Sequence, residues 1–267
     1  MWRAGMGATL ARRADYHPDV LVLLPPSETK SVPRRGRPLD LDRVSFPQLA
    51  TARTSVLDAV ALASAGDDAH AVLGVPASLS AEIARNLGLR EAPTAPAGEI
   101  YQGVLYDALD LGSLDPASRR RATRRLVVVS ALFGALRLTD RIPAYRLSMA
   151  VSLPGPGPLA RFWRQHVGAP LADAAGSGLI IDARSSTYAA AWTPPVDLAR
   201  RWVHIRVPGA THMAKHTRGL VARELCRVAH APRTPGALAD ALASSFEVSL
   251  DEPGRAGKPW ILDVSAS

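Results

Sequence analysis

The stretch VLVLLPPSETK, residues 20–30, begins with five consecutive apolar residues and passes through two prolines into four hydroxyl-bearing or charged side chains. A short, continuous apolar run is typical of a strand that is buried on both faces of a sheet. Comparable runs recur at 126–130, 179–182 and 202–207, separated by longer segments of helical period. This alternation predicts an α/β protein in which helices surround a sheet.

The segments between the apolar runs have the periodicity and the boundary residues of helices. Helices are expected at about 48–65, 78–88, 116–124, 158–167 and 211–230. The third has a defined start, because Asp115 can cap its first turn and Pro116 suits the first helical position. Near the end of the chain, FEVSL and PWILDV flank EPGRAGK and predict an antiparallel hairpin at the edge of the sheet, which makes the sheet mixed.

The same patterns indicate how the chain is divided. Residues 1–19 contain arginines but no apolar core of signal-peptide length, and we interpret them as a loose or disordered leader. Residues 20–267 are expected to form a single domain, because no long low-complexity linker interrupts them. Within this domain, residues 48–98 contain small residues and turn-like breaks but no strong strand, which indicates a helical subdomain.

Composition limits the classes of protein and of partner. The chain has 267 residues and a formal net charge of +8, which favours anionic partners such as nucleic acid or phosphorylated ligands. An arginine-rich solvated surface would give the same total. The single cysteine, Cys226, cannot form an internal disulfide, and this favours the cytoplasm. No run of eighteen apolar residues occurs, so no membrane is expected as a partner.

The segment PPSETK supplies the first candidate site residues. Open α/β sheets bind ligands at the carboxyl ends of their strands, where this segment is expected to lie. Ser27 offers a hydroxyl and Lys30 a positive charge for a phosphate or a carboxylate. Glu28 is either a structural partner of a cation or a group that transfers protons. The alternative for the whole segment is a proline turn with a solvated polar tip.

Three further segments, 126–149, 180–192 and 210–225, also place cationic and hydroxyl-bearing residues beyond a strand or on a helix. Their candidate ligands for an anion or for DNA are Arg137, Arg146, Arg184, Ser185, Ser186, Lys215 and Arg218. Ion pairs with Asp140 or Asp182, or simple helix capping, would explain these residues equally well. If the segments converge with PPSETK, they form one cationic, hydroxyl-lined cleft.

The helix expected at 211–230 has two further features. His212 and His216 lie one turn apart, but the glutamate of a metalloprotease motif is absent, so anion binding is favoured over a metal site. Gly219 costs about 1 kcal/mol relative to alanine inside a helix, which predicts that another group approaches closely there. Earlier in the chain, the five arginines of RRRATRR, 119–125, are expected to face water or to contact a phosphate backbone.

Five segments together resemble the YaaA peroxide-stress protein family. They are PPSETK, YQGVLYDALD at 101–110, SALFGALRLTDRIPAYRLSM at 130–149, DARSSTY at 182–188 and KHTRG at 215–219. Their order and spacing agree with the family from about residue 20 to the end, and two of them look more like its Gram-positive branch. The resemblance implies a cytoplasmic protein of the hydrogen peroxide response that limits unincorporated iron. It also implies a distinctive α/β fold with a positively charged cleft, a helix-hairpin-helix element and DNA binding.

Carried over by position, the helix-hairpin-helix element falls at 71–87, with Leu73, Gly74 and Val75 as its turn. Such elements hold a DNA backbone through loop amides without reading base sequence. The usual second glycine is replaced by Pro76, which removes one amide donor.

The sequence therefore supports more than one hypothesis about function. The first is a monomeric peroxide-stress protein that binds DNA without sequence specificity. The alternative is an enzyme for a small anionic substrate of the nucleotide or nucleobase type, with Lys30, Glu28 and Tyr145 as catalytic candidates. A third hypothesis is ferrous iron binding by His212 and His216 with Asp182. We rank this last and expect neither a metal nor a cofactor.

Overall fold

The computed structural model describes residues 20–209 and 211–266 of the chain. Within them, seven strands form one sheet in the order β10-β11-β9-β8-β1-β3-β4. The strands are β1 (Val20–Leu24), β3 (Leu126–Ser130), β4 (Gly134–Arg137), β8 (Leu179–Asp182), β9 (Trp202–Arg206), β10 (Phe246–Asp251) and β11 (Trp260–Ala266). The mixed α/β fold is thus confirmed. Residues 1–19, interpreted as a leader, lie outside the described residues.

The sheet is mixed because five parallel strands are bordered by one antiparallel strand at each edge. β1 pairs in parallel with β3 and β8, β8 pairs in parallel with β9, and β9 pairs in parallel with β11. β4 and β10 are the antiparallel edge strands. Every residue of β1, β3 and β8 is buried, as their continuous apolar runs predict. The carboxyl ends of these three strands therefore meet at one edge of the sheet.

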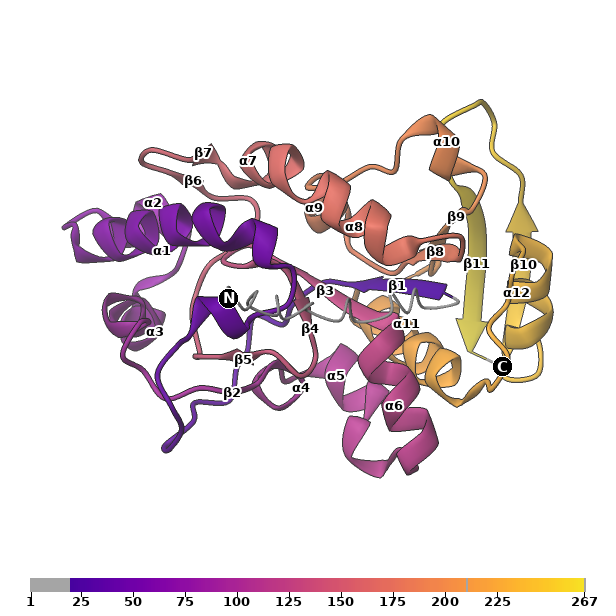
Figure 1. Ribbon diagram of the computed structural model, residues 1–267, viewed down its shortest axis with the longest axis horizontal. Helices are drawn as coiled ribbons and strands as arrows, with labels where there is room; N and C mark the ends of the chain where they lie inside the picture. The colour runs from indigo at the N-terminus through magenta and orange to yellow at the C-terminus, as the bar shows by residue number, and fades with distance from the viewer. Residues whose placement is uncertain (1–19, 210, 267) are drawn as a thin grey trace, which may run out of the picture.

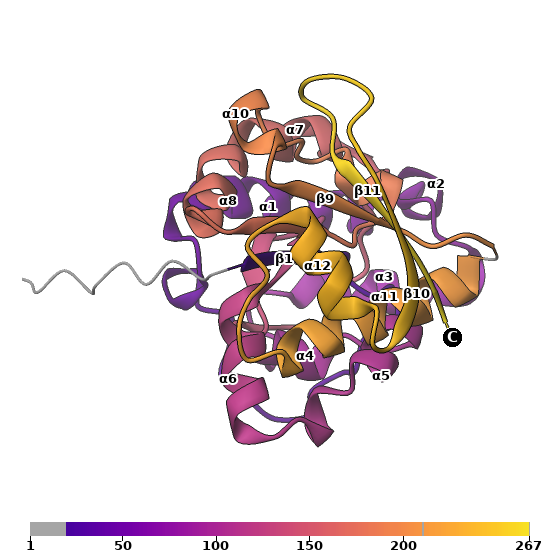
Figure 2. The same cartoon turned by 90° about the vertical axis from the view of Figure 1, so that its right-hand side faces the viewer.

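Helices cover both faces of the sheet and extend beyond one end of it (Figure 1). Their bounds are α1 (Ala50–Ala65), α2 (Ala69–Leu73), α3 (Ser80–Arg85), α4 (Ala97–Ile100), α5 (Val104–Leu109), α6 (Pro116–Arg125), α7 (Leu159–His166), α8 (Gly168–Ala175), α9 (Ser186–Ala189), α10 (Val196–Ala199), α11 (Thr211–Arg227) and α12 (Pro235–Leu242). α7 and α8 lie on one face, and α5, α6 and α11 lie on the other (Figure 2). α1, α2 and α3 lie at the end of the sheet away from β10 and β11 (Figure 1).

Shorter elements complete the fold. Single 3-10 turns occur at Leu41–Arg43, Pro47–Leu49, Ala77–Leu79, Asn86–Gly88 and Leu111–Ser113. Two short antiparallel ladders pair β2 (Ala95–Pro96) with β5 (Arg141–Ile142) and β6 (Ser152–Leu153) with β7 (Gly157–Pro158).

Local sequence signals explain several of these boundaries. The carboxylate of Asp115 accepts hydrogen bonds from the amides of Ala117 and Ser118, at 2.8 and 3.0 Å, and so caps α6 as predicted. Gly219 lets α11 approach α5 closely, because a β-carbon there would clash with the Leu105 carbonyl oxygen and lie 2.8 Å from the Ala108 side chain. The close approach predicted from this helical glycine is therefore confirmed.

The arginine-rich segment 119–125 meets the expectation that it faces water only in part, since Arg119, Arg120 and Arg124 are exposed. Arg121 donates to the carbonyl oxygens of Cys226 and Arg227, at 2.7 and 2.9 Å. Arg125 is buried and donates to the carbonyl oxygens of Leu225 and Val228, at 2.6 and 2.7 Å. These carbonyls end α11 and have no partner within the helix, so the arginines of α6 cap α11 from outside.

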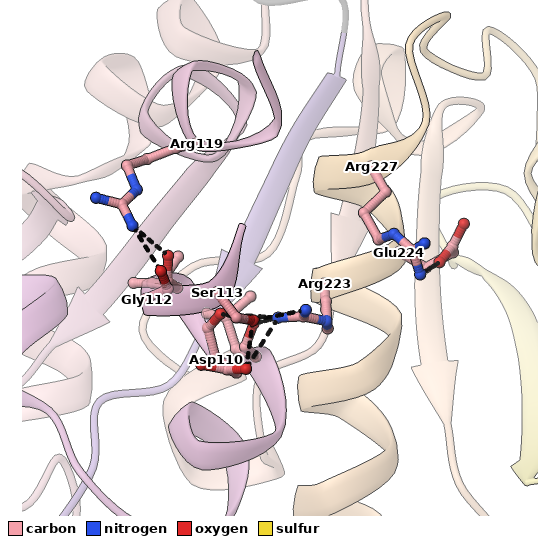
Figure 3. A network of polar contacts seen from close by, with 9 residues as sticks. Asp110, Gly112, Ser113, Arg119, Arg223, Glu224 and Arg227 are labelled. Carbon is pink, nitrogen blue, oxygen red and sulfur yellow. Dashed lines mark hydrogen bonds and ion pairs between the residues drawn. The ribbon is translucent and has the colours of Figure 1, made fainter. Parts of the chain in front are cut away.

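A second arginine network joins α6 and α11 to the turn between α5 and α6 (Figure 3). Arg119 donates to the Gly112 carbonyl oxygen at 2.8 Å. Arg223 donates to the Asp110 carbonyl oxygen and to the Ser113 hydroxyl, both at 2.7 Å. These arginines of α6 and α11 therefore stabilise the packing of α5, α6 and α11 and are only partly available to an external anion.

Candidate functional site

The loop after β1 is fastened to the segment that precedes α5. Lys30 forms an antiparallel bridge with Tyr101, and the Ser31 amide donates to the Ile100 carbonyl oxygen at 2.8 Å. The Ser27 hydroxyl donates to the Gln102 carbonyl oxygen. The PPSETK and YQG segments, seventy residues apart in the sequence, therefore form one structural unit at the carboxyl end of β1.

The Lys30 amine lies among backbone carbonyls and aromatic rings. Its Nζ donates to the Ser27 carbonyl oxygen at 2.7 Å and lies 4.2 Å from the centre of the Tyr145 ring. Burial, together with the smaller effect of the Arg146 charge, lowers the pKa of Lys30 to about 7 against the opposing effect of Glu82 and Glu28. Near neutral pH this amine is present in both its charged and its neutral form.

Tyr145 belongs to a buried chain of hydroxyl groups. Its hydroxyl lies 3.0 Å from that of Tyr101 and 2.8 Å from that of Ser130, the last residue of β3. The Ser130 oxygen also accepts from the amides of Leu132 and Phe133, at 3.2 and 3.1 Å, so its hydrogen points to Tyr145. Burial raises the pKa of Tyr101 and of Tyr145 well above the ordinary value, which keeps both phenols neutral.

Arg146 carries the second cation of the site and is paired on both sides. Its guanidinium lies 3.2 Å from the Glu28 carboxylate and 3.3 Å from the Glu82 carboxylate. Its backbone is held by buried Asn86, whose amide side chain accepts from the Arg146 amide and donates to the Arg146 carbonyl oxygen. The Glu28 side chain is 72% exposed, whereas that of Glu82 is 27% exposed. Lys30, Arg146 and the two carboxylates form a balanced charge cluster, which we call the Lys30 cluster.

Tyr188 joins the Lys30 cluster from the segment after β8. Burial raises the pKa of Tyr188 to about 12, while hydrogen bonds to the Met149 backbone and to the Ser148 side chain oppose this shift. The charge of Glu28 also raises this pKa, and that of Arg146 lowers it, so the phenol lies close to both.

Ser185 and Ser186 contribute less than the sequence suggests. Ser185 stands at the N-cap position of α9 without a side-chain capping bond, and Ser186 is exposed. The helix they begin has four residues.

Arg184 is not available to an external anion in this arrangement. It forms a fully buried ion pair with Asp182 at 2.6 Å and donates to the Trp192 carbonyl oxygen at 2.8 Å. Burial opposes ionisation of Asp182, but the Arg184 guanidinium outweighs burial and holds the pKa of that carboxyl below its ordinary value. Arg184 therefore forms a structural ion pair, which was the alternative to anion binding in the sequence analysis.

Arg137 lies on β4, an edge strand, and not on a loop beside Lys30. β4 runs antiparallel to β3, and Arg137 is paired with Val127 near the amino end of β3. Its guanidinium donates to the Arg124 carbonyl oxygen at 2.6 Å and lies 5.5 Å from the centre of the Phe46 ring. Because the strand reverses direction, Arg137 is carried away from the carboxyl edge that holds the Lys30 cluster.

α11 presents the remaining candidates. Arg218 is close enough to Asp182 for their charges to interact, and its buried Nε has no hydrogen-bond partner among the described residues. Lys215, His212 and His216 are exposed. His212 and His216 are not brought together with Asp182, since the described part of the chain contains no group of three or more metal-ligating side chains.

In the hairpin turn at Leu73, Gly74 and Val75, the backbone amides form hydrogen bonds within the turn itself. Gly74 adopts the left-handed conformation that ends α2, with its amide donating to the His70 and Ala71 carbonyl oxygens. The Val75 amide donates to the His70 carbonyl oxygen at 2.9 Å, and the His70 ring in turn donates to the Val75 carbonyl oxygen. The turn is therefore a helix C-terminus closed on itself, and these amides are not aimed at an external phosphate.

Of the residues that the sequence places in one cleft, the structure brings together Ser27, Glu28, Lys30, Tyr145 and Arg146. Sequence reasoning missed Glu82, Tyr101, Ser130 and Tyr188. Ser130 could have been found as the hydroxyl that ends a buried strand. Glu82 carries no local signal, because it belongs to α3 and reaches Arg146 only through the tertiary fold.

The fold and the site define an α/β protein with a lysine and tyrosine cluster at the carboxyl edge of a mixed sheet. The family model described as peroxide stress protein YaaA matches residues 20–250 of the chain. The chain therefore belongs to the YaaA peroxide stress protein family. The resemblance found in the sequence is confirmed.

Three relatives each cover most of the chain. A UPF0246 protein of Streptomyces coelicolor is 48% identical over 254 residues, which are 92% of this chain and 98% of the relative. A UPF0246 protein of Corynebacterium efficiens is 40% identical over 240 residues, with 87% and 96% covered. One from Corynebacterium glutamicum is 39% identical over 216 residues, with 77% and 84% covered. In the described residues, no helix combines the length and the apolar character that crossing a membrane requires.

Proposed function

We propose that this peroxide stress protein performs proton transfer on a small anionic substrate, of the nucleotide or nucleobase type, at the Lys30 cluster. The observation that carries the proposal is the position of the Lys30 amine over Tyr145, in surroundings that bring its pKa to about 7. Strongly shifted pKa values cluster at functional sites, and a base is most effective when its pKa lies near the working pH. A cytoplasmic location is part of the same proposal.

Each residue of the cluster has a distinct role in this proposal. The neutral form of Lys30 accepts a proton from the substrate. Arg146 binds the anionic group of the substrate in place of the exposed Glu28 carboxylate, while Glu82 keeps the guanidinium in position. Tyr145 and Tyr101 stay neutral and hold the amine in place through the ring contact and the hydroxyl chain.

The first experiment tests the amine itself. The chain has three lysines, so limited acetylation followed by mass spectrometry can compare Lys30 with the exposed Lys215 and Lys258 in one sample. The reactivity of Lys30 relative to the other two lysines is expected to be highest below about pH 7 and to fall above it, because the neutral fraction of Lys30 levels off there while that of an ordinary lysine still rises. Unchanged relative reactivity from about pH 6 to about pH 9 would remove the chemical basis of the proposal.

The second experiment connects the amine with function. Lys30→Met keeps the aliphatic stem and removes the amine, and Lys258→Met is the matched surface control. In a peroxide-sensitive strain that lacks the protein, Lys258→Met is expected to restore survival and Lys30→Met is not. A panel of nucleobases and nucleotides, tested by calorimetry, should contain ligands that bind the wild type and lose affinity in Arg146→Gln. Full protection by Lys30→Met would overturn the proposal.

A second candidate function is DNA binding without sequence specificity, with limitation of unincorporated iron as its cellular outcome. The distribution of charge favours α6, and not the hairpin, as the place where DNA makes contact. Residues 116–125 contain five arginines and no acidic residue, and Arg119, Arg120 and Arg124 are exposed. Residues 48–98, which include the hairpin, contain five acidic side chains against three basic ones. A polyanion is therefore attracted more strongly to α6 than to the region that includes the hairpin.

Duplex binding in about 50 and about 200 mM salt tests this second candidate. The wild-type affinity should fall steeply with salt, and an Arg119→Gln, Arg120→Gln double variant should reduce the salt slope by roughly two. Ser78→Glu adds negative charge at the exposed start of the second hairpin helix and should change little. If Ser78→Glu alone abolishes binding, the DNA contact is at the hairpin and this assignment to α6 is wrong.

A further inference from the structure

A groove that shares no residue with the Lys30 cluster lies beside the loop between β1 and α1. It is lined by residues 36–40, 43 and 44, together with Thr94, Thr139 and Arg141, and its volume is about 960 Å³. This volume is at the upper end of the range of small-molecule sites, so a ligand of nucleotide size fits.

The groove carries a surplus of positive charge. Arg37, Arg43 and Arg141 line it, against the single carboxylate of Asp40. Arg141 uses one nitrogen to donate to the Thr94 carbonyl oxygen at 2.5 Å, which leaves the rest of its guanidinium free to bind a ligand. Among residues 20–209 and 211–266, the side chains of Arg37 and Arg43 form neither an ion pair nor a hydrogen bond.

The backbone holds this groove in shape without a ligand. The Arg37 carbonyl oxygen accepts from both the amide and the hydroxyl of Thr94, at 3.1 and 2.8 Å. Gly36 permits this contact, because a β-carbon there would lie 3.0 Å from the Thr94 nitrogen and closer still to its carbonyl oxygen. At the other end of the loop, the hydroxyl of Ser45 donates to the Asp140 carboxylate at 2.7 Å. A site fixed in this way spends little free energy on ordering when it binds.

We propose that this groove binds a small ligand with a diphosphate or triphosphate group. Guanidinium groups match the oxygens of phosphate in a bidentate manner, and a net charge of about two positive units suits a polyphosphate better than a single carboxylate. Thr139 lines the groove, and its hydroxyl is a donor for one further oxygen. The proposal goes beyond proton transfer at the Lys30 cluster and does not depend on it.

Calorimetry with pyrophosphate and with ADP tests the proposal on the full chain. The wild type is expected to bind both saturably, and an Arg37→Gln, Arg43→Gln double variant to bind at least about tenfold more weakly. Both substitutions leave the backbone bonds of the loop in place. Arg35→Gln, an exposed arginine of the same loop that does not line the groove, is the matched control and should change affinity less than about twofold.

Three outcomes would overturn this inference. One is the absence of saturable binding of either probe, and another is an equal loss in Arg35→Gln and in the double variant. The third is a loss of duplex DNA binding in the double variant while pyrophosphate fails to compete with the duplex, which would make the groove a nucleic-acid contact. Lys30→Met should bind pyrophosphate like the wild type, so failure of the proton-transfer proposal leaves this result unchanged.

Discussion

The amine nitrogen of Lys30 lies 4.2 Å from the centre of the Tyr145 ring, and the hydroxyl of that same ring lies 2.8 Å from Ser130 at the end of β3. One aromatic ring thus connects the loop after β1 with the carboxyl end of the neighbouring strand. The ring face and the Ser27 carbonyl oxygen favour the charged amine. Burial and the charge of Arg146 favour the neutral amine, and they prevail.

This balance predicts a specific dependence of stability on pH. The pKa of Lys30 is lowered from 10.5 to about 7 in the folded protein, so between these values the unfolded chain binds more protons. The free energy of unfolding should therefore rise as pH increases from about 7 towards 10. In a completely buried group, a pKa shift of this size corresponds to about 5 kcal/mol in the free energy of unfolding. Because Lys30 is partly exposed, we expect a gain of roughly 2 kcal/mol.

Urea unfolding at about pH 6.5 and at about pH 9.5 measures the effect. The wild type should gain stability relative to Lys30→Met between the two pH values, because the methionine variant lacks the titrating amine. Other groups that titrate in this range contribute equally to both proteins and cancel in the difference. A constant difference between the two proteins across this interval would contradict the lowered pKa.

The contact between α5 and α11 predicts a large effect of one methyl group. Gly219→Ala places a β-carbon against the Leu105 carbonyl oxygen and the Ala108 side chain. The helices must separate, and we expect a loss of about 1–3 kcal/mol in the free energy of unfolding despite the better helix propensity of alanine.

Gly236→Ala is the matched control, since Gly236 lies in α12 and nothing within 4 Å would meet its β-carbon. This variant should be neutral or stabilised by up to about 1 kcal/mol. Chemical denaturation of both variants at one pH decides the matter. If both glycines respond alike, the close approach of α5 and α11 does not contribute to stability.

The buried pair of Asp182 and Arg184 predicts an effect of similar size with a different cause. Arg184→Met leaves the Asp182 carboxylate buried without its guanidinium partner, which should cost about 3–5 kcal/mol. The control is Arg206→Met, because the Arg206 side chain is 52% exposed although it also pairs with two aspartates. Its loss in urea unfolding should be much smaller, because solvent screens an exposed pair. Equal losses in the two variants would show that burial does not set the strength of these pairs.

The parts of the fold that sequence predicted are those with strong local signals. The apolar runs of β1, β3 and β8 are continuous because both faces of these strands are covered, and periodicity detects this directly. The start of α6 was predicted from a capping aspartate and a proline, which act within one turn. Such signals need no knowledge of the tertiary structure.

The features that the sequence did not predict are those that depend on tertiary contacts. β4 has four residues and begins at a glycine, too short for periodicity, and its reversal carries Arg137 away from the site. Gly134 is required there because its φ is +72° and a β-carbon would meet the Trp163 ring. The Lys30 cluster was predicted in part, from strand ends that meet at one edge. Glu82 could not be predicted, since α3 reaches Arg146 across the fold.

The arginines of α6 give the last prediction, because sequence alone suggests that they face water. Arg125 is 4% exposed, and its guanidinium donates to three carbonyl oxygens at the end of α11, those of Leu225, Val228 and Ala229. Arg125→Met fills most of the same volume but leaves these carbonyls without their donor. Each buried acceptor that loses its partner costs about 1–3 kcal/mol, and water reaching the helix end offsets part of the total, so we expect a loss of about 2–4 kcal/mol.

Exposed Arg120, on the same helix, is the matched control, and Arg120→Met should stay within about 0.5 kcal/mol of the wild type. Hydrogen exchange adds a local readout. Amides in the last turn of α11 should lose protection in Arg125→Met, while those of β1 should change only with global stability. If protection falls uniformly, or if Arg120→Met is equally destabilised, the role of Arg125 as an external cap of α11 is wrong and the helix end is satisfied by other groups.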